Sequence, residues 1–151
     1  MAAKATVLIV DDEPQMREFV RRVLATESLH LLEATDGADA LEVAGRQSTP
    51  IDLLLTDLRM PGMDGQRLAA ALRPNCPSMK VLFLTGYSDS LFVHDEPLPE
   101  GTAFEDKPVS SKRLREAVSL LLYGTLHPPT RILPHRPVSS PRPAGERDLR
   151  A

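Results

Sequence analysis

The chain of 151 residues has one cysteine, Cys76, and so cannot form an internal disulfide. A reducing cytoplasm suits such a protein. No apolar stretch is long enough to cross a bilayer, and the N-terminus runs from Met1 to Lys4 directly into a strand pattern, without the features of a secretory signal. We therefore expect a cytoplasmic protein with no membrane partner.

Nucleotide-binding signatures are also missing, because the sequence contains neither a P-loop nor a glycine-rich dinucleotide turn. The net charge is only −3, and it is unevenly distributed. Through Gly124 there are 13 Lys and Arg against 19 Asp and Glu, whereas the remainder has five against two. An acidic globular part with a basic tail is not typical of nucleic-acid binding, so we expect no DNA binding.

The composition changes after Gly124, which divides the chain into a domain of residues 1–124 and a tail of residues 125–151. The tail holds six prolines and five arginines with few apolar residues. It cannot bury enough surface to fold alone, and we expect it to be disordered. A solvated extension and a Pro-rich docking peptide are both open interpretations. The tail is too short for a DNA-binding output domain, which argues against a conventional transcription factor.

Short apolar runs alternate with helical patterns throughout the domain. This alternation predicts an α/β fold, a doubly wound five-stranded parallel sheet with right-handed crossovers. The segment between Ser88 and Glu100 contains Pro97 and Pro99 and lacks a helical stripe, so we expect a shortened fourth helix. The predicted strands are residues 6–10, 29–34, 51–56, 81–84 and 101–104, and the other helices begin near Glu13, Ala38, Asp64 and Ser110.

The run from Ile51 to Leu55 reads as a strand buried on both faces, and it leads to Asp57. Pro61, Gly62 and Gly65 then force a loop. Asp57 is therefore expected at the carboxyl end of a central strand, which is the edge where open α/β sheets bind ligands.

Two other predicted strands end in charged residues, the first in Asp11 and Asp12 and the fifth before Lys107. In a parallel sheet these groups meet Asp57 at one edge. Three close carboxylates repel one another unless a cation is present, and a hard divalent ion with oxygen ligands, Mg²⁺, is the candidate. Carboxylates, Mg²⁺ and a lysine suit a phosphoryl group, because the cations neutralise its oxygens while a carboxylate attacks phosphorus.

The ordered set of motifs resembles the receiver domain of two-component response regulators over roughly residues 4 to 123. It comprises Asp11-Asp12, Asp57 within Asp57-Leu58-Arg59-Met60-Pro61-Gly62-Met63-Asp64-Gly65, Thr85, and Lys107-Pro108. The segments Leu84 to Asp89 and Phe104 to Pro108 are most similar to C-terminal receivers of hybrid histidine kinases. The resemblance implies a flavodoxin-like fold with strand order 2-1-3-4-5.

The resemblance also implies a role for each site residue. Asp57 is the phosphoacceptor. Asp12, Asp57 and the backbone carbonyl of Arg59 bind Mg²⁺, and Asp11 orients metal-bound water. Lys107 pairs with Asp57 and then with a phosphoryl oxygen.

Three further features follow from the same resemblance. The Thr85 hydroxyl donates a hydrogen bond to the phosphoryl group. Phe104 is the aromatic residue of the switch. The Lys107–Pro108 peptide bond is cis.

Ordinary structural roles remain open beside these. Asp57 can serve as a turn or cap carboxylate, and the acidic pair can serve as a charge cluster at a helix N-terminus. Lys107 can be a surface lysine, and Phe104 can be a core residue.

We therefore expect a single-domain response regulator rather than an enzyme. It would accept a phosphoryl group on Asp57 from a histidine kinase or phosphotransfer protein, and switch binding to an unknown downstream protein or relay the group. One alternative is a haloacid-dehalogenase-like phosphatase, but such enzymes need a second acid two residues after the nucleophile, where this chain has Arg59. Another is a pseudo-receiver that binds partners without phosphorylation.

Overall fold

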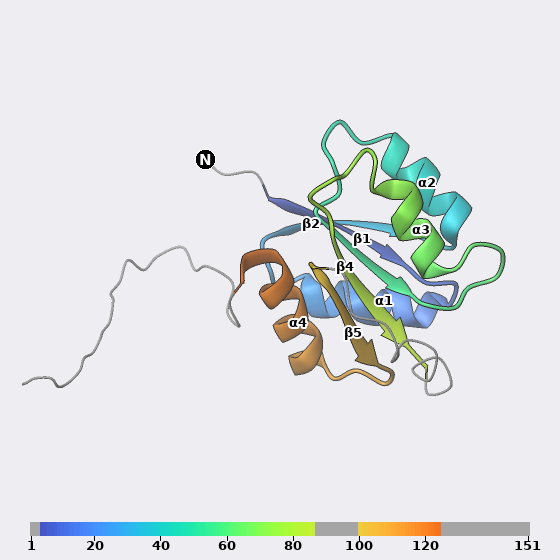
Figure 1. Ribbon diagram of the computed structural model, residues 1–151. Coiled ribbons are helices and arrows are strands. Elements are labelled where there is room, and N and C mark those ends of the chain that lie inside the picture. The colour runs from blue at the N-terminus through green and yellow to red at the C-terminus, as the bar shows by residue number, and fades with distance from the viewer. Residues whose placement is uncertain (1–3, 87–99, 125–151) are drawn as a thin grey trace, which may run out of the picture.

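Figure 1 shows the computed structural model, which describes residues 4–86 and 100–124. Its five strands are all parallel and follow the order β2-β1-β3-β4-β5. This topology confirms the predicted doubly wound, flavodoxin-like sheet. The strands are β1 (Ala5–Val10), β2 (Leu29–Ala34), β3 (Leu53–Asp57), β4 (Lys80–Thr85) and β5 (Thr102–Asp106).

The helices begin and end at residues suited to those positions. Pro14 opens the first helix, where its missing N–H costs little, and Gly124 ends the last helix in the left-handed conformation with φ 72°. The side chains of Asp36, Asp64 and Ser110 cap the other helix N-termini by accepting from backbone N–H groups. The helices are α1 (Pro14–Leu24), α2 (Gly37–Gly45), α3 (Gly65–Leu72) and α4 (Ser111–Tyr123).

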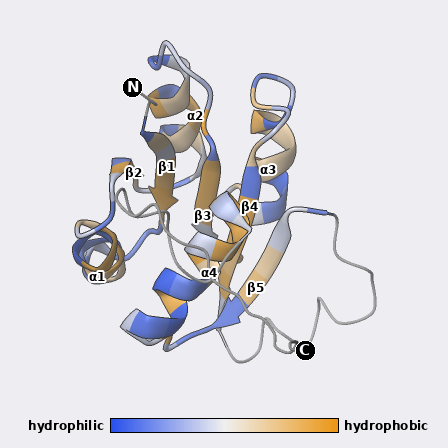
Figure 2. Ribbon diagram, turned by 90° about the vertical axis from the view of Figure 1, so that its left-hand side faces the viewer, coloured by the Kyte–Doolittle hydropathy of each residue, from blue (hydrophilic) through white to orange (hydrophobic). Residues whose placement is uncertain are grey.

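Two hydrophobic cores lie on opposite faces of the sheet. Helices α2 and α3 cover one face, and helices α1 and α4 cover the other (Figure 1). Figure 2 shows β1 and β3 as mainly hydrophobic, whereas α1 and α4 carry both hydrophobic and hydrophilic residues. Because both faces of the central strands are covered, all five residues of β3 are buried. The rigid, buried β3 is what supports Asp57 from behind.

Four strands differ from their predicted bounds: β1 is longer by one residue at its start and β4 by one residue at each end, while β3 and β5 differ by up to two residues. Strand β3 begins at Leu53 rather than Ile51, and strand β5 continues to Asp106 rather than stopping at Phe104. The sequence criterion was apolarity, which fails at Glu105 and Asp106, although both pair with β4. Backbone pairing at the edge of a sheet does not require an apolar side chain, because the outer end of the strand faces solvent.

Two predictions concern residues outside the described ranges: the shortened fourth helix between Ser88 and Glu100, and the disorder of residues 125–151. Within the described ranges, none of the helices has the length and apolarity needed to span a bilayer.

Candidate functional site

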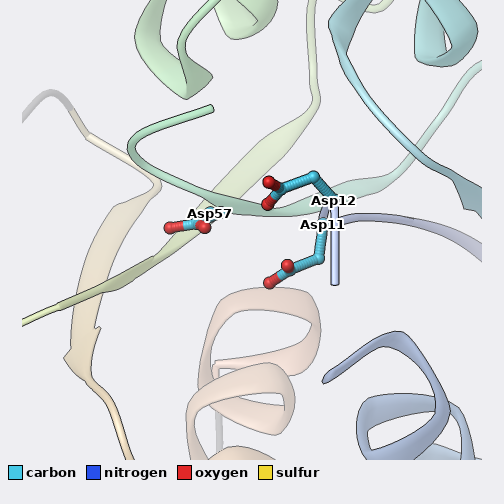
Figure 3. A group of neighbouring side chains, drawn as sticks. All are labelled: Asp11, Asp12 and Asp57. Atoms are coloured by element: carbon cyan, nitrogen blue, oxygen red, sulfur yellow. The ribbon is translucent and has the colours of Figure 1, made fainter. Parts of the chain in front are cut away.

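Three carboxylates meet at the carboxyl edge of the sheet, as the sequence predicts. Asp57 is the last residue of β3, and Asp11 and Asp12 directly follow β1, the neighbouring strand. Figure 3 shows the three side chains grouped at this edge. Each offers one oxygen such that the three oxygens lie within 4.8 Å of one another. Parallel strands whose ends align therefore bring together residues 46 positions apart.

Lys107 bridges two of these carboxylates. Its Nζ lies 3.2 Å from Oδ2 of Asp57 and 3.3 Å from Oδ2 of Asp11. The pairing with Asp57 matches the role that the resemblance implies, whereas the pairing with Asp11 was not foreseen. The peptide bond between Lys107 and Pro108 is cis.

The site is more buried than a typical cluster of charges. Asp11 is 2% exposed and Asp57 is 8% exposed, whereas Asp12 is exposed. Burial raises the pKa of Asp57, an effect that attraction to Lys107 opposes and repulsion from Asp11 reinforces. Burial likewise raises the pKa of Asp11, against a hydrogen bond from the backbone N–H of Glu13 and the attraction of Lys107.

Burial by itself would lower the pKa of Lys107, but attraction to Asp11 and Asp57 outweighs it and raises the pKa. Lys107 therefore remains a cation, while the folded protein disfavours the ionised forms of both buried aspartates. A second, divalent cation would relieve that cost.

Backbone contacts fix the loops that carry the acids. The N–H of Glu13 donates to Oδ1 of Asp11 at 2.9 Å, and Nη1 of Arg17 donates to the Asp11 carbonyl at 2.7 Å. The backbone N–H of Arg59 hydrogen-bonds the Asp57 carboxylate. Arg59 thus lies at the site, as the resemblance implies, although binding of a metal by its carbonyl stays a prediction. The contact from Arg17 has no signal in the sequence, because an arginine on an amphipathic helix that also carries Arg21 and Arg22 reads as a surface residue.

Gly65 allows α3 to begin against the end of β3. A Cβ at this position would lie 2.5 Å from the backbone carbonyl oxygen of Asp57. Side chains do not tolerate such an approach, so the position requires glycine. The N–H of Gly65 also donates to the Leu58 carbonyl at 2.9 Å, which closes the loop after Asp57.

Thr85 ends β4, as predicted, and its side chain is fully buried. Its hydroxyl donates to Oδ1 of Asp106 at 3.1 Å. Phe104 is partly buried and stacks on Phe83, with ring centroids 5.1 Å apart. Sequence reasoning missed Asp106, although the alignment of two parallel strand ends was a signal that could have placed it beside Thr85.

The donors present fit Mg²⁺. All three acidic side chains supply oxygen ligands, the kind that hard divalent cations prefer, and their close spacing leaves a deficit of positive charge that Lys107 alone does not cover.

Comparison with known proteins agrees with this geometry. The response regulator receiver domain model matches residues 7–119. The chain is 34% identical over 122 residues to the sensor kinase CckA of Brucella abortus, covering 81% of this chain but only 13% of that kinase. It is 31% identical over 116 residues to the response regulator receiver protein CpdR of the same organism, covering 77% of this chain and 95% of CpdR.

Solved structures agree as well. The crystal structure of the receiver domain from the hybrid histidine kinase CckA superposes with a TM-score of 0.66 at 32% identity, covering 78% of this chain and 99% of that one. The receiver domain of AraT from Geobacillus stearothermophilus gives a TM-score of 0.69 at 31% identity, covering 81% and 95%. The predicted likeness to hybrid-kinase receivers is thus confirmed. The chain therefore belongs to the response regulator receiver domains, which are signalling modules of two-component systems and not classical enzymes.

Proposed function

We propose that this protein accepts a phosphoryl group on Asp57 from a histidine kinase or a phosphotransfer protein. The observation that carries the proposal is the Lys107 ammonium, which lies between the carboxylates of Asp57 and Asp11 and within 3.3 Å of both. A lysine in this place supplies positive charge beside the nucleophile. After transfer, the same charge can neutralise the negative oxygens of the phosphoryl group.

In the proposed reaction an oxygen of Asp57 attacks the phosphorus of a phosphohistidine, forming a P–O bond as the P–N bond breaks. The electron pair of the P–N bond goes to the imidazole, which leaves as a neutral ring if its other nitrogen carries a proton. The product is an acyl phosphate on Asp57. Lys107 can then pair with a phosphoryl oxygen, because its ammonium already lies beside the Asp57 carboxylate that would carry the group.

Asp11, Asp12 and Asp57, together with the carbonyl of Arg59, would hold Mg²⁺. When bound, Mg²⁺ would neutralise phosphoryl oxygens during transfer.

The same proposal includes a downstream protein whose binding changes with phosphorylation, or to which the group is relayed. The match to CpdR, a response regulator receiver protein of which this chain covers 95%, supports a role carried by the receiver domain itself. The buried free thiol of Cys76 is compatible with the cytoplasm, where we place this function.

The phosphatase alternative is not supported, since the matched family is the receiver family and the position two residues after Asp57 is Arg59.

The test is intact-mass measurement after incubation with Mg²⁺ and acetyl phosphate. Wild type should gain one phosphoryl group, and Asp57→Asn should gain none. The matched control is Asp52→Asn, which changes a carboxylate just before the same strand and should be phosphorylated like wild type. Chelation of Mg²⁺ should abolish the adduct.

A wild-type protein that is folded but forms neither an acetyl phosphate adduct nor a complex with beryllofluoride would refute the proposal. The domain would then be a binding module that works without phosphorylation.

A further inference from the structure

Two cross-strand pairs link β4 to β5 just before Lys107. Phe83 pairs with Phe104, and Thr85 pairs with Asp106, in the same parallel register. Because side chains alternate along a strand, both pairs lie on one face of the sheet. The aromatic rings stack at 5.1 Å with 22° between their planes, and the next pair is joined by the hydrogen bond from the Thr85 hydroxyl to Asp106.

The Thr85 hydroxyl can donate one hydrogen bond, and the carboxylate of Asp106 accepts it. Thr85 is fully buried, so its hydroxyl has little access to water, whereas Asp106 is exposed. The backbone is held as well, because the N–H of Lys107 donates to the Thr85 carbonyl at 2.8 Å. Thr85 is therefore tied to β5 through both its side chain and its main chain.

We propose that Asp106 is a positioning residue that competes with the phosphoryl group for the Thr85 hydroxyl, and so weakens the phosphorylated form. This inference rests on the proposed phosphorylation of Asp57 and on the contact between Thr85 and the phosphoryl group that the resemblance to receiver domains implies. Donation by Thr85 to a phosphoryl oxygen requires the bond to Asp106 to break first, because the single proton cannot serve both acceptors. The free energy of breaking that hydrogen bond reduces the net free energy gained when Thr85 contacts the phosphoryl group.

The chain offers a matched control in the adjacent residue. Glu105 carries the same charge as Asp106 on the same strand, but its carboxylate pairs with Arg113 of α4 at 3.0 Å rather than with Thr85. Comparing Asp106→Ala with Glu105→Ala therefore separates loss of the acceptor from loss of a negative charge near the site.

The main experiment measures the affinity for beryllofluoride, in the presence of Mg²⁺, by the ¹⁹F NMR signal of the bound form. We expect Asp106→Ala to bind about 3- to 10-fold more tightly than wild type, the range for one net hydrogen bond. Glu105→Ala should bind like wild type. Asp106→Asn keeps an acceptor oxygen without the charge, and should also remain close to wild type.

Thr85→Val removes the donated proton with little change of shape. In the Thr85→Val background, Asp106→Ala should have no further effect on beryllofluoride affinity. A second readout needs no phosphoryl mimic. The three-bond couplings of Thr85 should report one side-chain rotamer in unmodified wild type and averaging between rotamers in Asp106→Ala.

Equal beryllofluoride affinity of wild type and Asp106→Ala would overturn the inference while leaving the proposed function intact. A gain in Asp106→Asn as large as that in Asp106→Ala would also overturn it, because the effect would then come from charge repulsion. Absence of any beryllofluoride complex with wild type would refute the proposed function, and this inference with it.

Discussion

One aspartate directly precedes strand β3 and another ends it, and the two carboxylates have opposite environments. Asp52 directly precedes the strand, is exposed, and accepts a hydrogen bond from the Thr6 N–H at 2.7 Å. Asp57 ends the strand, is 8% exposed, and lies beside two further carboxylates. The same residue type thus fastens two strands at one end of β3 and gathers negative charge at the other.

The comparison distinguishes Asp52, whose carboxylate stabilises the fold, from Asp57, whose position favours reactivity over stability. Asp52 satisfies a backbone donor at small cost, since it stays in water. Asp57 is held where burial and Asp11 both oppose its ionised form, and where, within residues 4–86 and 100–124, Lys107 and the backbone N–H of Arg59 compensate. The buried carboxylates at the carboxyl edge lower the stability of the fold, and a bound cation would relieve that cost.

The largest expected effect comes from the tight contact behind Asp57. Gly65→Ala should lower the free energy of unfolding by about 2–4 kcal/mol, because its Cβ would collide with the Asp57 carbonyl. Gly45→Ala is the matched control, since nothing lies within 4 Å of a Cβ at the last residue of α2. That change should be neutral or slightly stabilising. Equal results in denaturant unfolding would contradict the close packing at this end of β3.

The next effect concerns the charge of Asp57. Asp57→Asn should raise the free energy of unfolding at pH 7 without Mg²⁺ by on the order of 1 kcal/mol, because it removes an ionised form that burial disfavours. Denaturant titrations with and without Mg²⁺ measure this. Added Mg²⁺ should stabilise wild type and reduce the gap, because the ion binds only the folded protein.

This gap should also depend on pH. The pKa of Asp57 is raised on folding from its ordinary value of 3.8, so folded Asp57 takes up a proton at a higher pH than unfolded Asp57 does. The wild type is therefore relatively most stable below 3.8 and loses stability as pH rises through the raised pKa. Its difference from Asp57→Asn should vanish at low pH and grow toward neutrality. A less stable Asp57→Asn at pH 7 would show that Lys107 outweighs burial.

At the other end of the strand the sign should reverse. Asp52→Ala should lower the free energy of unfolding by roughly 0.5–1.5 kcal/mol, the usual net value of one hydrogen bond, here to the Thr6 N–H. Thermal or denaturant unfolding provides the check, and the difference between Asp52→Ala and wild type should be the same with and without Mg²⁺. A stabilised Asp52→Ala would remove the contrast between the two aspartates.

The smallest effect is expected at the surface pair of Arg113 and Glu105. Arg113→Ala should leave the free energy of unfolding unchanged within error, since both solvent and salt screen an exposed guanidinium. Unfolding at low and high ionic strength is the measurement. A clear loss of stability at low salt would mean that this pair holds β5 to α4.

Much of this arrangement could be predicted from local pattern. Apolar runs specify strands, and the capping residues Asp64 and Ser110 specify where helices begin, because these preferences act over a few residues. The meeting of Asp11 and Asp57 follows from the parallel sheet. Strand β5 was predicted too short, because its last two residues pair through the backbone while their side chains are polar.

What the sequence determined by itself was the order of the elements and the edge at which the acidic and basic groups gather. Only the tertiary structure decided that Lys107 reaches Asp11 as well as Asp57, that Arg17 holds the Asp11 carbonyl, and that Thr85 donates to Asp106. Side-chain partners depend on register, on twist and on which neighbours burial brings within 3.5 Å. Those quantities are set by packing of the whole domain, whereas strand and helix patterns are set by neighbouring residues.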